Sequence, residues 1–409
     1  MSRKSPFNTT QNIFTDRDVF DVEGFQPEEL IERDEQINEY ASALEPVLNG
    51  WRPNNIFIYG KTGTGKTATT RYMLDWLRRD VRSHNEDRDG DEIDLSIVYL
   101  NCEALTSSYQ VAVELLNELR DDHNQVATRG HAPSDIYNWL FEELDEIGGV
   151  VLTVLDEVDN VGDDDTILYK LSRPEIENAT LGVVGISNDF SFRDDLSAKV
   201  KDSLCEKEIL FPAYESEELR EILFQRAEKG LHADAYDTAP VALSAAYAAQ
   251  DKGSARQAID ILREAGDIAR REDADEITEE HVEEAKGVVE RGRVSEMIQG
   301  LSPHGQYALH ALAIAERRDE TPIRTKDLYE FYGSICNQHA TDPLSARALR
   351  DHMSEIDLIG LATVDKKNAG RAGGKYKQYE LDVKVDRVVE AFAETDAVEV
   401  DENTYQSTL

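Results

Sequence analysis

A glycine-rich segment has the composition of a phosphate-binding loop. Residues 60–67 read GKTGTGKT; they follow the apolar run 56–59 and precede a helical pattern that begins near Lys66. The glycines would let backbone N–H groups converge on phosphate oxygens, and the helix would add the positive end of its dipole. Lys66 would supply a point charge for the outer phosphates, and the Thr67 hydroxyl would bind Mg²⁺. A chance match in a glycine turn is the alternative, which the flanking strand disfavours. We expect nucleotide contacts from Gly60, Lys61, Thr62, Gly63, Thr64, Gly65, Lys66, Thr67 and Ala68 and, further along the chain, from Tyr214 and Arg256.

An apolar run that ends in two carboxylates supplies the second half of such a site. Residues 150–155 are apolar except for one threonine and lead directly into Asp156 and Glu157. Asp156 would hold the Mg²⁺ through water, beside the Thr67 hydroxyl, and Glu157 would polarise the attacking water. A buried strand that merely ends in an acidic turn is the alternative, and the phosphate loop makes it the weaker one.

Two further polar residues stand where a phosphate sensor is needed. The apolar run 181–187 ends at Asn188, which we expect to orient the water near the terminal phosphate, although asparagine is also a common turn residue. Arg256 lies in the first turn of a predicted helix, where its charge opposes the helix dipole unless an anion compensates. We therefore expect it to contact the terminal phosphate from the lid, and a solvated arginine is the alternative. The predicted catalytic residues are therefore Lys66, Asp156, Glu157, Asn188 and Arg256.

The elements that must position these residues change character along the chain. Between residues 12 and 213, apolar runs alternate with helical patterns, which predicts an α/β domain with a parallel sheet and helices on both faces. Residues 214–295 show helical periodicity without a strand signal, which predicts an all-helical lid. Residues 296–385 contain three helical patterns and two strand-like runs, the outline of a winged helix. We expect disorder in 1–11 and an acidic, loosely held tail in 386–409.

Composition narrows the setting. The three cysteines lie far apart with no metal-binding spacing, so a disulfide framework is not expected and the cytoplasm is the predicted compartment. No apolar run approaches membrane-spanning length.

Charge is the most unusual property of the composition. With 83 acidic and 44 basic residues, the formal net charge is −39, and the acids are spread along the chain. Such a surface repels itself in dilute buffer, whereas in molar salt the screening length falls to about 3 Å. We interpret the charge as adaptation to a high-salt cytoplasm, an interpretation that full stability in dilute buffer would contradict. An ordinary acidic protein is the alternative.

The order of these motifs resembles one known family. GKTGTGKT, VLTVLDEVD, GISND and GSARQAIDILREA, followed by a winged helix, are similar to archaeal initiator ATPases of the AAA+ class, relatives of the origin recognition complex and of the cell-division-control helicase loaders. The resemblance covers about residues 12–385. It implies an ATP-controlled protein that binds double-stranded origin DNA and helps recruit the replicative MCM helicase. We expect ATP, ADP and Mg²⁺ as ligands and slow ATP hydrolysis that acts as a switch, and the sequence leaves open whether the protein acts alone or beside paralogous initiator subunits. The resemblance also implies that residues 31–37 hold the adenine by packing and backbone contacts.

The chain departs from the family pattern at a position that contacts a neighbouring subunit's ATP. The family usually reads Arg-Val-Lys-Ser-Ser-Leu there, whereas this chain reads Lys199-Val200-Lys201-Asp202-Ser203-Leu204. Lysine keeps the charge but loses the bidentate fork of arginine. Lys199 and the nearby Arg193 are the candidates for this role. The lid motif also has Ser254 where an acidic residue is common.

Because the chain is strongly acidic, we expect its DNA contacts to be confined to small regions of positive charge. Residues 366–379 carry five positive charges and no acid. The preceding helix has a predicted buried stripe of Leu349, Met353 and Ile356, which turns two arginines outward, and arginine can pair bidentately with guanine. The resemblance adds a contact from 103–133, centred on residues 129–131. The predicted DNA contacts are Arg129, Arg347, Arg350, Lys366, Lys367, Arg371, Lys375 and Lys377.

Two other functions use parts of the same pattern. A clamp loader shares the ATPase motifs, but it would be expected to carry a Ser-Arg-Cys segment near residue 203 and a helical C-terminal collar, and neither is seen. A DNA-binding regulator that keeps nucleotide only as a structural component would not need Glu157 and Asn188.

Overall fold

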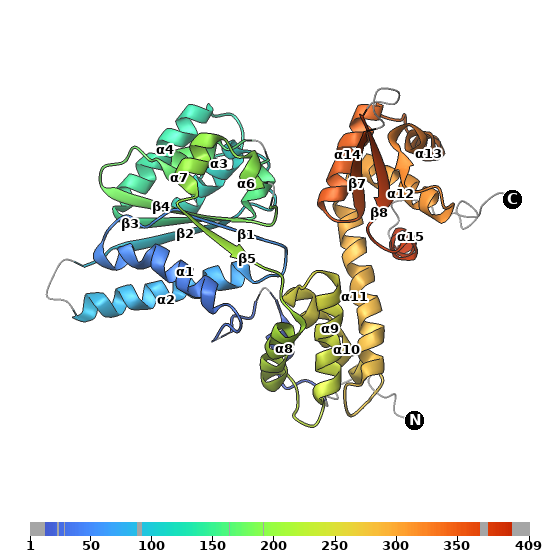
Figure 1. Cartoon of the computed structure of the whole chain (residues 1–409). Coiled ribbons are helices and arrows are strands. Elements are labelled where there is room, and N and C mark those ends of the chain that lie inside the picture. Colours follow the sequence, from blue (N-terminus) through green and yellow to red (C-terminus); the bar gives the residue numbers. More distant parts are fainter. Residues whose placement is uncertain are drawn as a thin grey trace, which may run out of the picture. The chain divides into compact units, whose positions relative to one another are not determined.

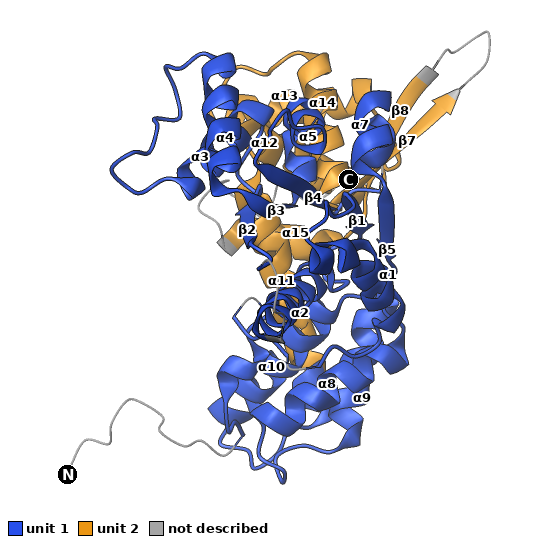
Figure 2. Cartoon of the chain, turned by 90° about the vertical axis from the view of Figure 1, so that its left-hand side faces the viewer, with its two compact units in different colours: residues 1–282 blue, residues 283–409 orange. Residues whose placement is uncertain are grey.

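The computed structural model describes residues 13–22, 24–27, 29–87, 92–162, 164–190, 192–368 and 375–394. It divides into two compact units, Met1–Val282 and Glu283–Leu409, coloured separately in Figure 2. The predicted sheet domain therefore shares one unit with most of the lid, and the predicted arm 1–11 lies outside the described residues.

A five-stranded parallel sheet forms the centre of the first unit, as the sequence predicts. Its spatial order is β2-β3-β4-β1-β5 (Figure 1). The strands are β1 (Ile56–Gly60), β2 (Leu95–Asn101), β3 (Gly149–Asp156), β4 (Ala179–Ser187) and β5 (Lys207–Phe211). The loops after β1, β3 and β4 thus leave neighbouring strands at the same edge, because these three strands are adjacent and parallel.

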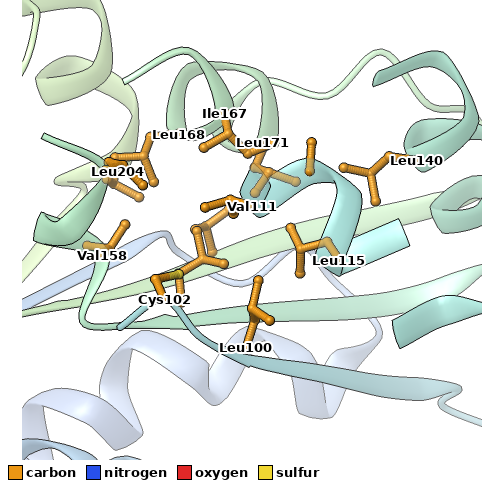
Figure 3. Packing of buried hydrophobic residues seen from close by; sticks show 14 of the residues in the cluster. Leu100, Cys102, Val111, Leu115, Leu140, Val158, Ile167, Leu168, Leu171 and Leu204 are labelled. Atoms are coloured by element: carbon orange, nitrogen blue, oxygen red, sulfur yellow. The ribbon is translucent and has the colours of Figure 1, made fainter. Parts of the chain in front are cut away.

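Helices cover both faces of the sheet. One face packs on α1 (Asp34–Leu44) and α2 (Lys66–Asp87) and the other on α3 (Ser108–Leu119), α4 (Pro133–Ile147), α5 (Thr166–Ser172) and α7 (Ala198–Leu204), with the short α6 (Phe192–Asp195) before α7. The two faces hold separate clusters of buried side chains. Within β1, Ile56 and Ile58 belong to the cluster that contains α1 and α2, and Phe57 belongs to the cluster on the opposite face. Burial on both faces explains why the strands read as nearly continuous apolar runs. Figure 3 shows part of the cluster that contains Phe57, where side chains from α3 lie over the end of β2.

A helical lid follows the sheet. It comprises α8 (Ser216–Gly230), α9 (Thr238–Asp251), α10 (Ala255–Arg271) and the start of α11 (Glu279–Gly300). Leu219, Leu223 and Ala227 of α8 are buried and Ile222 is half-buried, while Ala258, Ile259, Leu262 and Ala265 of α10 are buried, in agreement with the helical periodicity of this region.

The second unit contains helices α12, α13 and α14 and a three-stranded antiparallel sheet of order β6-β8-β7, which together confirm the predicted winged helix. Its elements are α12 (Pro303–Arg317), β6 (Ile323–Arg324), α13 (Thr325–Gln338), α14 (Ala346–Leu358), β7 (Ala362–Asn368) and β8 (Lys375–Leu381).

The predicted loosely held tail is wrong for its first part. Residues Val385–Glu394 form α15, and Val388, Ala391 and Phe392 are fully buried in the core of the second unit. The burial of this apolar stripe outweighs the acidic composition of the segment. Residues 395–409 lie outside the described residues.

Within the described part of the chain, no helix is both long and apolar enough to cross a membrane. All three cysteines are free thiols.

Candidate functional site

The loop between β1 and α2 has the backbone geometry of an anion cradle. Gly63 and Gly65 adopt φ of 79° and 91°, a region that side-chain-bearing residues rarely enter. Gly60 is required for a different reason, since a Cβ there would lie 2.4 Å from the Phe211 carbonyl oxygen of β5. The predicted glycine pattern thus combines two backbone turns with one close approach between strands.

Lys66 lies at the start of α2 and is only 5% exposed. Its Nζ donates to the carbonyl oxygens of Gly60 and Lys61, at 2.7 and 2.9 Å. Burial lowers the pKa of Lys66 to about 8, although the nearby Asp156, Asp159 and Glu157 oppose this shift. An anionic ligand would favour the charged ammonium, because it would replace the water that burial removes.

Asp156 accepts hydrogen bonds from three directions. Thr67 Oγ1 donates to its Oδ2 at 2.9 Å, the Tyr99 hydroxyl donates to the same oxygen, and the Glu157 backbone N–H donates to Oδ1 at 3.0 Å. The predicted metal pair, Thr67 and Asp156, is therefore in direct contact. Their hydroxyl and carboxylate oxygens suit Mg²⁺, which needs few protein ligands when phosphates and waters supply the rest. Elsewhere in the described residues, no group of three or more His, Cys, Asp or Glu could hold a metal.

Glu157 and Asn188 meet beside this pair. Asn188 Nδ2 donates to Glu157 Oε1 at 3.3 Å, and the Asn188 backbone N–H donates to Asp159 Oδ1 at 3.1 Å. Burial raises the pKa of Glu157, and the negative charges of Glu103 and Asp156 raise it further. A carboxylate with a raised pKa, oriented by an amide, can act as a general base near neutral pH.

These residues line one cavity of about 410 Å³, a volume suited to a nucleotide-sized ligand. Thr62, Gly63, Gly65, Lys66, Thr67 and Ala68 contribute to its lining, together with Tyr214 and Arg256. The other predicted loop residues, Gly60, Lys61 and Thr64, do not line it; they shape the loop from outside. Arg256 is in the first turn of α10, as predicted, and enters the cavity from the lid.

An N-terminal segment contributes to the wall of the cavity. Its apolar lining residues are Val22, Phe25, Pro27, Leu30 and Ile31. Of the predicted base-holding segment 31–37, only Ile31 lines the cavity, so most of the apolar wall comes from residues that precede it.

Several site residues have no recognisable sequence signal. Tyr99 is a strand residue that reaches Asp156 only because β2 pairs with β3. Arg226 of α8 is 7% exposed, donates to the Val19 carbonyl and lies 4.3 Å from the Phe25 ring centroid. Arg33 is buried behind the phosphate loop. A lone arginine in a charged sequence is usually solvated, and only the tertiary structure distinguishes these two.

Arg193 and Lys199, the candidates for contacting the ATP of a neighbouring subunit, are not among the residues that line the cavity. Arg193 forms two hydrogen bonds with the Glu208 carboxylate, at 2.8 and 2.6 Å. This contact raises the pKa of Arg193. Lys199 is exposed, with Nζ 5.9 Å from the Tyr169 ring centroid. Arg193 would have to leave Glu208 before it could serve a partner.

In the second unit, α14 presents the face that the sequence predicts. Leu349, Met353 and Ile356 are buried, whereas Arg347 and Arg350 are exposed. The helix begins with a capped turn, in which Ser345 Oγ accepts from the Ala348 N–H at 3.3 Å.

The predicted wing is the β7–β8 hairpin. Lys366 and Lys367 are exposed on β7, and Lys377 Nζ on β8 donates to Ser354 Oγ of α14 at 3.1 Å. Lys367 pairs with Asp365 at 2.8 Å, so an acid just before the positive stretch compensates part of its charge. Arg371 and the side chain of Lys375 lie outside the described residues.

Arg129 is exposed in the loop between α3 and α4 of the first unit. Beside it, His131 packs edge-on against Trp139, and its carbonyl accepts a hydrogen bond from Tyr109 at 3.4 Å.

Comparison with known families assigns three consecutive regions. An AAA domain model matches residues 52–184, a Cdc6 AAA+ ATPase-type lid domain matches 220–287, and a CDC6 C-terminal winged helix domain matches 296–391.

Individual relatives extend over nearly the whole chain. The ORC1-type DNA replication protein 11 of Haloarcula marismortui is 45% identical over 95% of this chain and 93% of its own length. The ORC1-type DNA replication protein 8 of Halobacterium salinarum is 46% identical over 96% of this chain and 99% of its own. Both relatives are haloarchaeal, which agrees with the interpretation of the net charge as salt adaptation.

A solved structure shares the architecture. The Aeropyrum pernix ORC1 protein, determined in complex with DNA, matches with a TM-score of 0.80 and 31% identity over 94% of this chain and 98% of that one.

Proposed function

The chain belongs to the ORC1/Cdc6-type family of AAA+ replication initiators, and we propose that its nucleotide state controls how its winged helix engages double-stranded origin DNA. The observation that supports this most is the contact of Thr67 with Asp156, and of Asn188 with Glu157, in a cavity that the lid residue Arg256 also lines. A site that only stored nucleotide would not need the second contact.

This arrangement supports hydrolysis of ATP to ADP and phosphate. The Glu157 carboxylate would accept a proton from the attacking water, which Asn188 helps to place in line with the terminal phosphate. Lys66 and Arg256 would stabilise charge on the outer phosphate oxygens. Mg²⁺, when bound at Thr67 and Asp156, would neutralise further phosphate charge.

We propose slow turnover for the isolated chain. An arginine from a neighbouring subunit commonly accelerates such reactions by several orders of magnitude. Here Arg193 is paired with Glu208 and the other candidate is a lysine, which lacks the bidentate fork. ATP would then persist long enough to act as a switch. Because this chain offers no free arginine at these two candidate positions, we expect a paralogous subunit that supplies one to accelerate ATP hydrolysis. The hydrolysis rate of the mixture would test this.

Replacing Arg350 with alanine should weaken duplex binding in molar KCl roughly 5- to 100-fold, the range expected for loss of a base contact. Arg350 is exposed on α14, the helix expected in the major groove. Fluorescence anisotropy with a labelled origin duplex would measure the change.

The exposed Lys384, next to α15, offers the matched control. Lys384→Ala removes one positive charge from the same unit and should leave affinity nearly unchanged. Equal affinities for the Arg350→Ala and native proteins would exclude Arg350 as a base contact.

Nucleotide affinity should fall about tenfold between pH 7 and pH 9, because the pKa of Lys66 is about 8 in the free protein and the phosphates require its charged form. Binding above pH 8 should therefore take up a proton. Calorimetry in buffers of different ionisation enthalpy measures this uptake directly. A flat affinity without proton uptake would mean that Lys66 stays fully charged in the free protein.

The family resemblance supports a further role in recruiting the MCM helicase. Co-sedimentation of the two purified proteins on origin DNA would test it, and separate sedimentation would exclude direct recruitment. A clamp-loader function is disfavoured, because a winged helix follows the lid in place of a helical collar. The cytoplasmic location stays a prediction.

A further inference from the structure

Several carbonyl groups of the phosphate loop accept hydrogen bonds. Lys66 Nζ donates to those of Gly60 and Lys61, and the Thr69 N–H donates to that of Gly65. The Gly63 carbonyl accepts from the Ala255 N–H of the lid at 2.9 Å. The Thr64 carbonyl oxygen also accepts hydrogen bonds, and their donor lies in a distant part of the sequence.

That donor is Arg33. Its Nε and Nη2 both donate to the Thr64 carbonyl oxygen, at 3.2 and 3.0 Å, and Nη2 also donates to the Pro212 carbonyl at 3.0 Å. The side chain thereby joins the start of α1, the phosphate loop and the segment after β5. Within the described part of the chain, its guanidinium forms no salt bridge, and the residue is 2% exposed.

Burying a guanidinium without a carboxylate is costly. Burial lowers the pKa of Arg33, although the nearby Tyr214, Glu218 and Glu32 oppose part of this shift. The carbonyl oxygens and a facing aromatic ring offset part of this cost. A neutral side chain could fill the same space without the free-energy cost of burying a charge. We therefore ask which geometry of the phosphate loop depends on the guanidinium.

The imposed geometry concerns one peptide group. In a trans peptide, the carbonyl of one residue and the N–H of the next point in opposite directions. Because Arg33 draws the Thr64 carbonyl outward, the Gly65 N–H points to the opposite side, where Gly65 lines the cavity. Arg33 therefore fixes one of the loop donors in the direction of a bound phosphate.

Tyr214 links this arrangement to the lid. The Arg33 guanidinium carbon lies 3.5 Å from the centroid of the Tyr214 ring. The Tyr214 N–H donates to the Gly253 carbonyl at 3.0 Å, directly before α10, which carries Arg256. A Cβ on Gly65 would lie 2.7 Å from the Tyr214 hydroxyl oxygen, so the ring also packs closely behind the loop.

We propose that Arg33, stacked on Tyr214, is a positioning residue that holds the Thr64–Gly65 peptide in its phosphate-binding orientation and couples that orientation to the base of the lid. This inference rests on the proposed nucleotide site and deepens it. A change in the conformation of the loop would displace Tyr214, and a movement of the lid would change the orientation of the Thr64–Gly65 peptide.

The test is the nucleotide affinity of Arg33→Lys in molar KCl. Lysine keeps the charge but can neither span the Thr64 and Pro212 carbonyls nor stack as a plane. ADP and ATP should both bind about 10- to 100-fold more weakly, the range for loss of one hydrogen bond to a charged group. Tyr214→Leu, which removes the stacked ring, should change affinity in the same direction.

Arg52→Lys is the matched control. Arg52 also donates to backbone carbonyls, those of Leu181 and Ser172, at 3.3 and 3.2 Å, but it pairs with Glu206 at 3.7 Å and does not line the cavity. Its replacement should cost some thermal stability without changing nucleotide affinity.

Hydrogen exchange separates positioning from general destabilisation. In the native protein, ADP should slow exchange across residues 60–67, and in Arg33→Lys this nucleotide-dependent protection should be reduced. Native affinity and protection in Arg33→Lys would overturn the inference. A native protein that binds no nucleotide would instead refute the proposed function, so the two failures are distinguishable.

Discussion

Lys66→Ala is expected to reduce ADP and ATP affinity at least about 100-fold. The ammonium is buried at the centre of the loop, where hydrogen bonds to charged groups contribute about 1.5–3 kcal/mol each. The variant also removes the donor to the Gly60 and Lys61 carbonyls, so the loop loses part of its internal support. Titration with a fluorescent nucleotide analogue in molar KCl would measure the loss.

The same loop supplies a control. The Lys61 side chain is exposed and does not line the cavity. Lys61→Ala removes one positive charge five residues away and should bind nucleotide within about threefold of the native protein. If Lys66→Ala retained native affinity, the assignment of residues 60–67 as a phosphate loop would be wrong.

Glu157→Gln should stop turnover while ATP binding persists. Glutamine preserves the shape of the side chain and can still contact Asn188, but it cannot accept a proton, and a general base typically contributes about 100-fold or more. Steady-state phosphate release and nucleotide titration together would measure the two effects. Glu103→Gln, which neutralises another carboxylate of the same cavity, should keep most of the activity. Equal turnover in Glu157→Gln and the native protein would exclude Glu157 as the base.

The nucleotide motifs could be predicted because their chemistry depends on local spacing. Lys66 and Thr67 are adjacent to the glycines they act with, and Asp156 with Glu157 directly follows a strand. The order of the strands brings the two halves together. It places β4 between β1 and β3, and so sets Asn188 beside Glu157. The spacing along the chain does not encode this order.

Other features depend on contacts between distant residues. Arg33 and Thr64 are 31 positions apart, and no periodicity marks the arginine as buried. Tyr99 acquires its role only through the pairing of β2 with β3. In contrast, α15 did carry a signal, because Val385, Val388, Val389 and Phe392 follow helical spacing. The acidic residues around them obscured it.

The most direct measurement is genome-wide footprinting with the purified protein in molar KCl, in the presence of ATP or of ADP. If the nucleotide cavity controls the winged helix, protection should occur at a small number of sites and should differ between ATP and ADP. In Lys66→Ala this difference should vanish. Identical footprints with both nucleotides in the native protein, or no site-specific protection, would contradict control of DNA binding by the nucleotide.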